Sequence, residues 1–340
     1  MSPENAVAGV TLAAAVVYAV LAGADFGGGI WDLLARGPRR EEQRAAVAHA
    51  MGPVWEANHV WLIFVIVLLF TAFPPAFAAL GVALFVPFHL VLLGIILRGA
   101  AFVFRAYSPQ GARPLLPGRP RPRWGVVFGA ASALTPVLLG MCLGAVSSGG
   151  VRVRGGEVWI QGTPPWLTPV ALVMGAFALA VCAYLAAVYL ANETRGPLRD
   201  DFRCRALWAG TATVALSVLA LPLLRVEAPH LWRGLLSARA LPLLAVGVGA
   251  ALLSGWALLA RRFRLARVAT VAQTACLLAG WGIAQFPYLV YPDVTVGSAA
   301  GPPGTLRFVL WTLPFGMALL LPSLWLLFRV FKGEHLTREE

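Results

Sequence analysis

Charged residues are scarce in this sequence, and long hydrophobic runs take their place. Of the 340 residues, 12% are charged and 59% are hydrophobic, whereas a soluble domain of this length needs far more charge to cover its surface. The first five residues hold no basic side chain, so a cleaved signal peptide is not expected. Composition therefore excludes a soluble protein and predicts an integral membrane protein.

Motifs that would carry chemistry by themselves are also lacking. The four cysteines form no C-x-x-C pair, and we interpret them as small buried residues rather than metal ligands or disulfide partners. The run Gly27-Gly28-Gly29 is not a phosphate loop, because no strand precedes it and no lysine follows it. No Cys/His cluster with metal-site spacing and no Ser/His/Asp constellation is visible. The sequence predicts no metal site and no complete active site in this chain.

Nine hydrophobic stretches are long enough to cross a membrane, for which roughly 20 residues are needed. They predict an all-α integral membrane protein with about nine transmembrane helices, organised as a single polytopic domain over residues 1–340. Residues 41–50 predict a short amphipathic helix, and the Pro/Arg-rich segment 105–123 predicts an irregular loop. The predicted spans are residues 6–24, 54–72, 76–97, 124–146, 168–191, 206–224, 238–260, 268–288 and 306–330.

The basic residues are distributed unevenly between the loops. The net charge is +12, and 21 of the 27 Lys and Arg residues fall in the loops after the first, third, fifth and seventh spans and in the C-terminal tail. By the positive-inside rule these loops face the cytoplasm, so the N-terminus is predicted outside and the C-terminus inside. We therefore interpret the positive charge as a determinant of topology and not as a nucleic-acid surface.

The segment GPVWEANHVWLI, residues 52–63, places ionisable groups at the head of an apolar helix. Glu56 lies in the first turn of the predicted span, where a carboxylate favours the positive end of the helix dipole, and Trp55 could anchor the helix at the membrane surface. That interpretation does not explain His59, which shares a helical face with Glu56. A carboxylate beside an imidazole can accept and pass protons. The segment is therefore either a helix start or part of a proton path.

A second polar cluster, GADFGGG at residues 23–29, begins at the end of the first predicted span. Asp25 is interfacial if the helix ends near Ala24, and lies roughly 16 Å deep if the helix continues to Arg36. The three glycines either allow close helix packing or break the helix. Arg98, at the end of the third predicted span, either extends to the membrane surface or pairs with Glu56 or Asp25.

Two other polar residues have less specific interpretations. His89 lies near the middle of the predicted span 76–97, where it is either a buried, hydrogen-bonded histidine or a metal ligand. Arg105 follows Arg98 by seven residues on the same face and is interpreted as a loop charge.

These segments together resemble subunit II of the cytochrome bd-type quinol oxidases. The resemblance rests on GADFGGG at 23–29, GPVWEANHVWLI at 52–63, LRGAAFVFR at 97–105 and YLVYP at 288–292, and nine spans in this order fit the family over effectively the whole chain. It implies a heterodimer in which a larger subunit I holds the haems, of types b and d, and the loop that oxidises quinol. Electrons then pass to oxygen, and the protons for water come from the cytoplasm.

The resemblance also implies where the chain resides and what it contacts. It implies a multi-pass protein of the bacterial cytoplasmic (inner) membrane that ligates no haem and binds subunit I. Small accessory subunits, membrane lipid and a bound quinone are further candidate partners, and Trp55 and Trp61 are candidate contacts to them. No nucleic-acid partner is expected.

Residue by residue, the resemblance assigns proton transfer to two carboxylates. In the family, the acid after the first Trp of the second motif is associated with a proton pathway, and Glu56 holds that position, where Asp is commoner. Asp25 matches the second acid of a D-G-F-D-like turn, whose first acid is replaced by Ala22. His59 stands where Gln is frequent and is a candidate to compensate for the lost acid. His59 and Arg98 are expected to tune or pair with the two carboxylates.

Three hypotheses follow from these observations. The leading one is a required subunit of a membrane quinol:oxygen oxidoreductase that stabilises the haem-bearing subunit and supplies a cytoplasmic proton path. The alternative is a proton-coupled secondary transporter or channel, in which the glycine run marks a broken helix. A purely structural version of the first hypothesis assigns the chain packing against subunit I and no role in proton transfer.

Overall fold

The chain folds into a bundle of long α-helices. The computed structural model describes residues 2–107, 123–160 and 162–333, except for the side chains of 51–57, 106–107 and 327–333. Within this part of the chain the helices are α1 (Pro3–Leu33), α2 (Arg40–Ala72), α3 (Pro74–Ala83), α4 (Phe85–Tyr107), α5 (Arg123–Ser148), α6 (Pro169–Glu193), α7 (Gly196–Glu227), α8 (Pro229–Leu235), α9 (Leu241–Leu259), α10 (Phe263–Gln285) and α11 (Pro303–Gly333).

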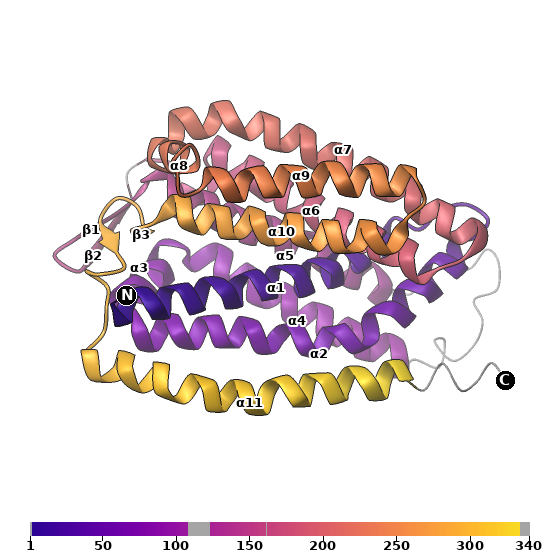
Figure 1. Ribbon diagram of the computed structural model, residues 1–340, viewed down its shortest axis with the longest axis horizontal. Helices are drawn as coiled ribbons and strands as arrows, with labels where there is room; N and C mark the ends of the chain where they lie inside the picture. The colour runs from indigo at the N-terminus through magenta and orange to yellow at the C-terminus, as the bar shows by residue number, and fades with distance from the viewer. Residues whose placement is uncertain (1, 108–122, 161, 334–340) are drawn as a thin grey trace.

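The long helices run side by side along one axis, so the bundle has two distinct ends (Figure 1). One end carries the start of α1, the short helices α3 and α8, and the strands; we call it the hairpin end. The other carries the end of α1, the start of α2, and the α6–α7 and α9–α10 connections; we call it the arginine-rich end. The positive-inside count assigns the arginine-rich end to the cytoplasm, and this orientation stays a prediction.

The all-α membrane fold is confirmed. Among the described residues, eight helices are long and apolar enough to cross a membrane, and a ninth is reached if the bent pair of α2 and α3 counts as one span. The segment 41–50, predicted as a separate amphipathic helix, is instead continuous with the following apolar run in α2. Most of the segment 105–123, predicted as an irregular loop, lies outside the described residues.

The third predicted span, 76–97, is wrong at both boundaries. Pro74 and Pro75 begin the separate helix α3, which turns 117° away from the preceding part of α2. A new helix, α4, then begins at Phe85 and continues to Tyr107. Pro87 explains the break, because proline in a continuous helix would clash with the carbonyl of residue 83, whereas it fits the first turn of a new helix.

This break also moves His89 to the beginning of α4. Its side chain is exposed, with Nδ1 2.7 Å from the carbonyl oxygen of Phe85 and the imidazole packed against the Phe85 ring. His89 is therefore not the buried, mid-helix histidine that the sequence predicted.

The glycine run lies within an unbroken helix. α1 continues through residues 27–29 to Leu33. A Cβ atom on Gly27 would lie 1.9 Å from the carbonyl oxygen of Cys182 on α6, and one on Gly29 would lie 2.1 Å from Ser132 Oγ on α5. The glycines thus allow α1 to pack closely between two neighbouring helices. Of the two interpretations of this run, the structure shows close packing.

Two antiparallel hairpins that the sequence did not predict cover the hairpin end (Figure 1). Strands β1 (Val151–Arg154) and β2 (Glu157–Ile160) pair Arg152 with Trp159 and Val153 with Val158, and β3 (Tyr288–Val290) pairs with β4 (Val294–Thr295). The two hairpins are joined by Asp293, which accepts hydrogen bonds from Arg152 Nε at 2.7 Å and Val153 N at 2.9 Å.

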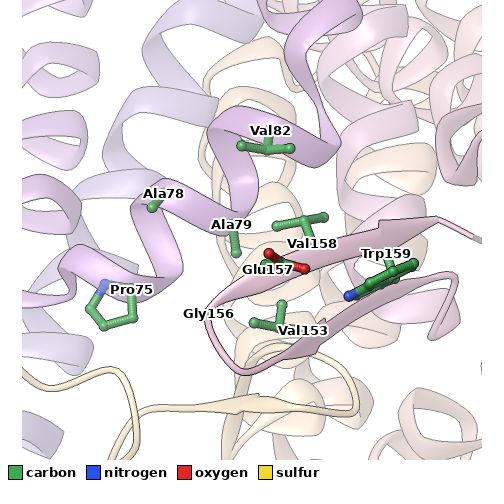
Figure 2. Close-up of a pocket in the computed structure, with 9 residues that line it drawn as sticks. All are labelled: Pro75, Ala78, Ala79, Val82, Val153, Gly156, Glu157, Val158 and Trp159. Atoms are coloured by element: carbon green, nitrogen blue, oxygen red, sulfur yellow. The ribbon is translucent and has the colours of Figure 1, made fainter.

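A groove of about 520 Å³ lies between α3 and the β1–β2 hairpin (Figure 2). Proline, alanine and valine side chains form most of its wall, and Glu157 is its one charged lining residue. The groove therefore offers an apolar surface with little polar chemistry.

Candidate functional site

A buried ion pair between α1 and α4 forms the centre of the candidate site. Asp25 and Arg98 are 1% and 2% exposed. Arg98 donates from Nη1 to Asp25 Oδ2 at 2.8 Å, and from Nη2 to Asp25 Oδ1 and to the Asp25 carbonyl oxygen. Its Nε donates to Ser132 Oγ on α5 at 2.9 Å. Both oxygens of the carboxylate are thus held by a two-pronged, charge-assisted contact.

Asn58 of α2 completes the cluster around Asp25. Its Nδ2 donates to Asp25 Oδ2 at 2.7 Å, so helices α1, α2, α4 and α5 all contribute to one polar centre. Asn58 Oδ1 and the Tyr18 hydroxyl are buried and have no hydrogen-bond partner among the described residues. An unpaired buried polar atom is costly, so these two atoms are where internal water would be stabilised.

Aromatic rings enclose the guanidinium of Arg98. Its central carbon lies 5.1 Å from the centre of the Phe26 ring and 4.9 Å from that of Phe128. Cation–π contacts of this kind stabilise a cation that has left water. They help to explain how the helix bundle tolerates a nearly inaccessible arginine.

A second ion pair lies one heptad further along both helices. Arg105 donates from Nη1 and Nη2 to the two carboxylate oxygens of Asp32 at 3.1 and 3.2 Å. Seven residues of helix correspond to roughly 10 Å, so the two pairs form successive levels toward the arginine-rich end. The Phe128 ring also faces Arg105, at 5.4 Å. Arg105 is therefore a helical residue in a half-buried pair, and the loop-charge interpretation of Arg105 was wrong.

A separate polar network at the arginine-rich end joins the start of α2 to α7. Asp201 of α7 accepts from Arg39 Nη2 at 2.6 Å and from Gln43 Nε2 at 3.0 Å, and Gln43 Oε1 accepts from Arg205 at 2.6 Å. The Arg205 guanidinium also lies 5.2 Å from the ring of Trp31, the residue next to Asp32. We call the two ion pairs Asp32–Arg105 and Asp25–Arg98, together with Asn58, the polar column.

The remaining residues of the second motif are only partly described. The side chains of Glu56 and Trp55 lie outside the described part, although the backbone of both belongs to α2. His59 is half-buried on the same helix. Trp61 packs its ring edge-on against Phe64 with ring centres 6.4 Å apart, and its buried Nε1 has no partner among the described residues.

Sequence analysis missed three members of the polar column: Asn58, Asp32 and Arg105. The last two carry a recognisable signal, because Asp25 and Asp32 are seven residues apart and so are Arg98 and Arg105. Two acidic residues on one helix and two basic residues with the same spacing on a parallel helix can form ion pairs at successive levels. Asn58 gave no such signal, because the sequence does not show which face of α2 meets Asp25.

Within the described residues, no three His, Cys, Asp or Glu side chains lie close enough together to hold a metal ion. The fold and the polar column define the chain as a multi-pass helical membrane protein with charged residues inside the bundle.

Residues 4–331 match the family model described as cytochrome bd terminal oxidase subunit II, and the chain belongs to this family. It is thus a subunit of a quinol oxidase complex and a multi-pass protein of the bacterial inner membrane.

Individual relatives agree with this assignment. The chain is 24% identical over 326 residues to a Bacillus subtilis (strain 168) protein described as a cytochrome bd menaquinol oxidase subunit II, covering 93% of this chain and 91% of that protein. It is 26% identical over 206 residues to cytochrome bd-I ubiquinol oxidase subunit 2 of Escherichia coli (strain K12), covering 60% and 52%. The solved structure of bd oxidase from Geobacillus thermodenitrificans has the same fold, with a TM-score of 0.81 at 22% identity over 97% of this chain and 99% of that one.

Proposed function

We propose that this chain stabilises the haem-bearing subunit I of a quinol:oxygen oxidoreductase and provides a path for the protons that reduce oxygen to water. The observation that carries the proposal is the polar column, two ion pairs at successive levels of α1 and α4 that lead from Asp32, near the arginine-rich end, to a nearly inaccessible carboxylate at Asp25. Ionisable residues inside membrane helices are costly and typically mark ion or proton routes. Family membership supplies the reaction that needs such a route.

Within this path, Glu56 is the group that binds and releases the proton. The Asp25 carboxylate is already occupied by Arg98 and Asn58, and a proton on it would place a donor against the guanidinium donors. Transfer through Asp25 therefore requires Arg98 to move. Asp25–Arg98 accordingly acts as a fixed pair that positions α2, and Glu56 lies two residues before Asn58 on that helix.

His59 and Arg98 act on the two carboxylates. His59 follows Glu56 by three residues, a spacing that places both on one helical face, so we assign its imidazole to proton exchange with the Glu56 carboxylate. Arg98 keeps Asp25 oriented. Asn58 Oδ1 and the Tyr18 hydroxyl, both buried without a partner in the described part, supply places where water can extend the path.

Subunit I is proposed to cover the face formed by α2 and α4. Both helices contribute to the polar column, so a partner seated there lies nearest to it. Haems b and d and the quinol-oxidising site are assigned to that partner, where they supply the electron transfer, and Trp61 is a candidate contact to the partner, lipid or quinone. The exposed apolar residues of the face include Ile63, Val67, Phe70, Phe88, Leu92 and Ile96.

The transporter alternative loses its structural support. It required a broken helix at the glycine run, and α1 is continuous there. The polar column is compatible with both the proton-path proposal and its purely structural version, so the test must separate these two.

Glu56→Gln in the intact complex provides that test. We expect oxygen consumption and proton uptake to fall about a hundredfold or more, in the range associated with loss of a positioned proton-transfer group, while the haem absorption bands and the elution profile of the complex stay normal. Glu157→Gln, the same change in the groove at the hairpin end, is the matched control. Wild-type turnover in an assembled Glu56→Gln complex would remove the proton role, and loss of assembly without a turnover defect in the remaining complex would favour the structural version.

A further inference from the structure

A basic hollow lies at the arginine-rich end, away from the polar column. It has a volume of about 610 Å³ and sits where α6 ends, α7 begins and the α9–α10 connection passes. We call it the arginine hollow. Its lining residues are Asn192, Glu193, Arg195, Arg199, Arg261, Phe263 and Arg264.

Two of its four arginines have no counter-ion. Arg195 and Arg264 are exposed, and neither makes a side-chain hydrogen bond or ion pair with any residue the structure describes. The one acid in the lining, Glu193, is already paired with Arg267 at 3.2 Å. Like charges gathered in one hollow repel each other unless an anion enters. The hollow therefore carries uncompensated positive charge, which favours the binding of an anion.

The other two arginines hold the shape of the hollow. Arg199 donates from Nε to the Thr194 carbonyl oxygen at 2.6 Å and lies 4.9 Å from the centre of the Phe263 ring. Arg261 pairs with Asp200 at 3.1 Å. These contacts tie the α6–α7 connection to the start of α10, so the two unpaired arginines project from a defined wall.

Backbone N–H groups at two helix starts add to the attraction of the arginine hollow for anions. The long helices α7 and α10 both begin at this hollow, and neither Arg195 nor Arg262, the residues that precede them, caps the helix with its side chain. The first N–H groups of a helix lack partners within the helix and favour anions, phosphate in particular.

An exposed apolar strip continues from the hollow along α9 and α10. Leu252, Trp256 and Leu259 are exposed on α9, which ends at the hollow, and Val268 is exposed on α10, which begins there. Arg262 lies 5.2 Å from the Trp256 ring, at the boundary between charge and apolar surface. The combination matches a ligand with an anionic head and hydrocarbon chains.

We propose that the arginine hollow binds the headgroup phosphate of an anionic phospholipid, whose acyl chains lie along the strip on α9 and α10. The positive-inside count places this end in the cytoplasmic leaflet, where anionic lipids meet basic pockets between helices. A free phosphate ion would use the arginines and leave the apolar strip unused. Such a lipid would fix the α6–α7 and α9–α10 connections relative to each other.

The test measures phosphatidylglycerol binding to the purified, intact oxidase complex by native mass spectrometry. Arg195→Gln/Arg264→Gln removes the two unpaired charges and leaves Arg199 and Arg261 in place. One arginine near a membrane surface raises the affinity for an anionic lipid about fivefold. Because two arginines are removed, we expect the affinity of the tightest phosphatidylglycerol site to fall about thirtyfold. Arg225→Gln/Arg239→Gln, the same charge change at exposed arginines of the opposite end, should leave that site unchanged.

Further arms distinguish the source of the phosphate. Phosphatidylcholine with the same chains should not compete, and a large excess of inorganic phosphate should not displace phosphatidylglycerol. Unchanged affinity in the double variant, or equal binding of phosphatidylcholine, would overturn the proposal. Displacement by inorganic phosphate would replace the lipid site with a free-anion site. If the double variant does not assemble, each single variant is measured instead, with about a fivefold loss expected.

Discussion

Two aspartate–arginine pairs in this chain are both two-pronged and have opposite surroundings. Asp25 and Arg98 meet inside the bundle with side chains 1% and 2% exposed, whereas Asp293 and Arg152 meet at the hairpin end with side chains 21% and 34% exposed. In both pairs the guanidinium donates to both carboxylate oxygens. The number of carboxylate oxygens that the guanidinium contacts therefore does not distinguish the pairs, and access to solvent does.

The difference lies in what remains when one partner is removed. At the hairpin end, water can solvate the remaining charge, so the pair contributes little beyond local geometry. Inside the bundle, bulk water does not reach the remaining charge, and an unpaired charge there costs several kcal/mol of desolvation. The buried pair therefore acts as a requirement for assembly of α1, α2, α4 and α5, and the surface pair orients two hairpins.

The largest effect is expected for Asp25→Asn. This change leaves Arg98 buried without its counter-ion and places an amide against its donors, at a cost of about 3 to 5 kcal/mol. We expect little assembled complex, measured as the yield of monodisperse material in detergent and by the thermal midpoint of what remains.

A double variant tests whether burial is the cause. Replacing both Asp25 and Arg98 with leucine removes both charges, and such replacements of buried pairs are often close to neutral. We expect the double variant to recover much of the yield lost in Asp25→Asn. If the double variant assembles no better than Asp25→Asn, the specific hydrogen bonds stabilise the complex, and the unpaired charge is not the cause of the loss. Burial would then not explain the difference between the two aspartate–arginine pairs.

Asp32→Asn should have an intermediate effect. Asp32 is buried with 5% of its side chain exposed, but its partner Arg105 is 29% exposed, so the remaining arginine can turn toward the membrane surface. We expect a cost of about 1 to 2 kcal/mol, between the buried and the surface limits, seen as a lower thermal midpoint with assembly retained. If Asp32→Asn lowered the stability as much as Asp25→Asn does, the partial exposure of Arg105 would not reduce the cost of leaving it unpaired.

The sequence predicts the apolar spans well, because each is set by local composition. It does not predict how deep a charge lies, since Asp25 is interfacial or buried according to where α1 ends. The predicted span 76–97 misses the break at Leu84, which Pro87 marks in the sequence. The partners Asn58 and Ser132 depend on how four helices rotate against each other, which no segment encodes alone. Asp293 has its partner, Arg152, in a distant hairpin, which no local pattern indicates.

Asp293→Asn should have the smallest effect on global stability. The pair is partly exposed, so we expect no more than about 1 kcal/mol and normal assembly of the complex. The local effect should be clear, because Val153 N loses its carboxylate acceptor. Hydrogen exchange at the Val153 amide should become faster in Asp293→Asn, while amides in the middle of α5 stay unchanged.

Acidification should remove the same local stabilisation in the wild-type protein. The hydrogen bonds from the Arg152 guanidinium hold the pKa of Asp293 below its usual value, against the opposing effect of partial burial. A depressed pKa means that the stabilising contribution is complete above the unfolded-state value of about 4 and is lost as the pH falls through the lower, folded-state value. We therefore expect the difference in Val153 protection between wild type and Asp293→Asn to be constant from neutral pH to about pH 5 and to shrink below about pH 4. Asparagine does not titrate, so the variant corrects for the intrinsic pH dependence of exchange. A difference that already disappears near neutral pH would mean that water, and not the charge on Asp293, sets the geometry of the hairpin end.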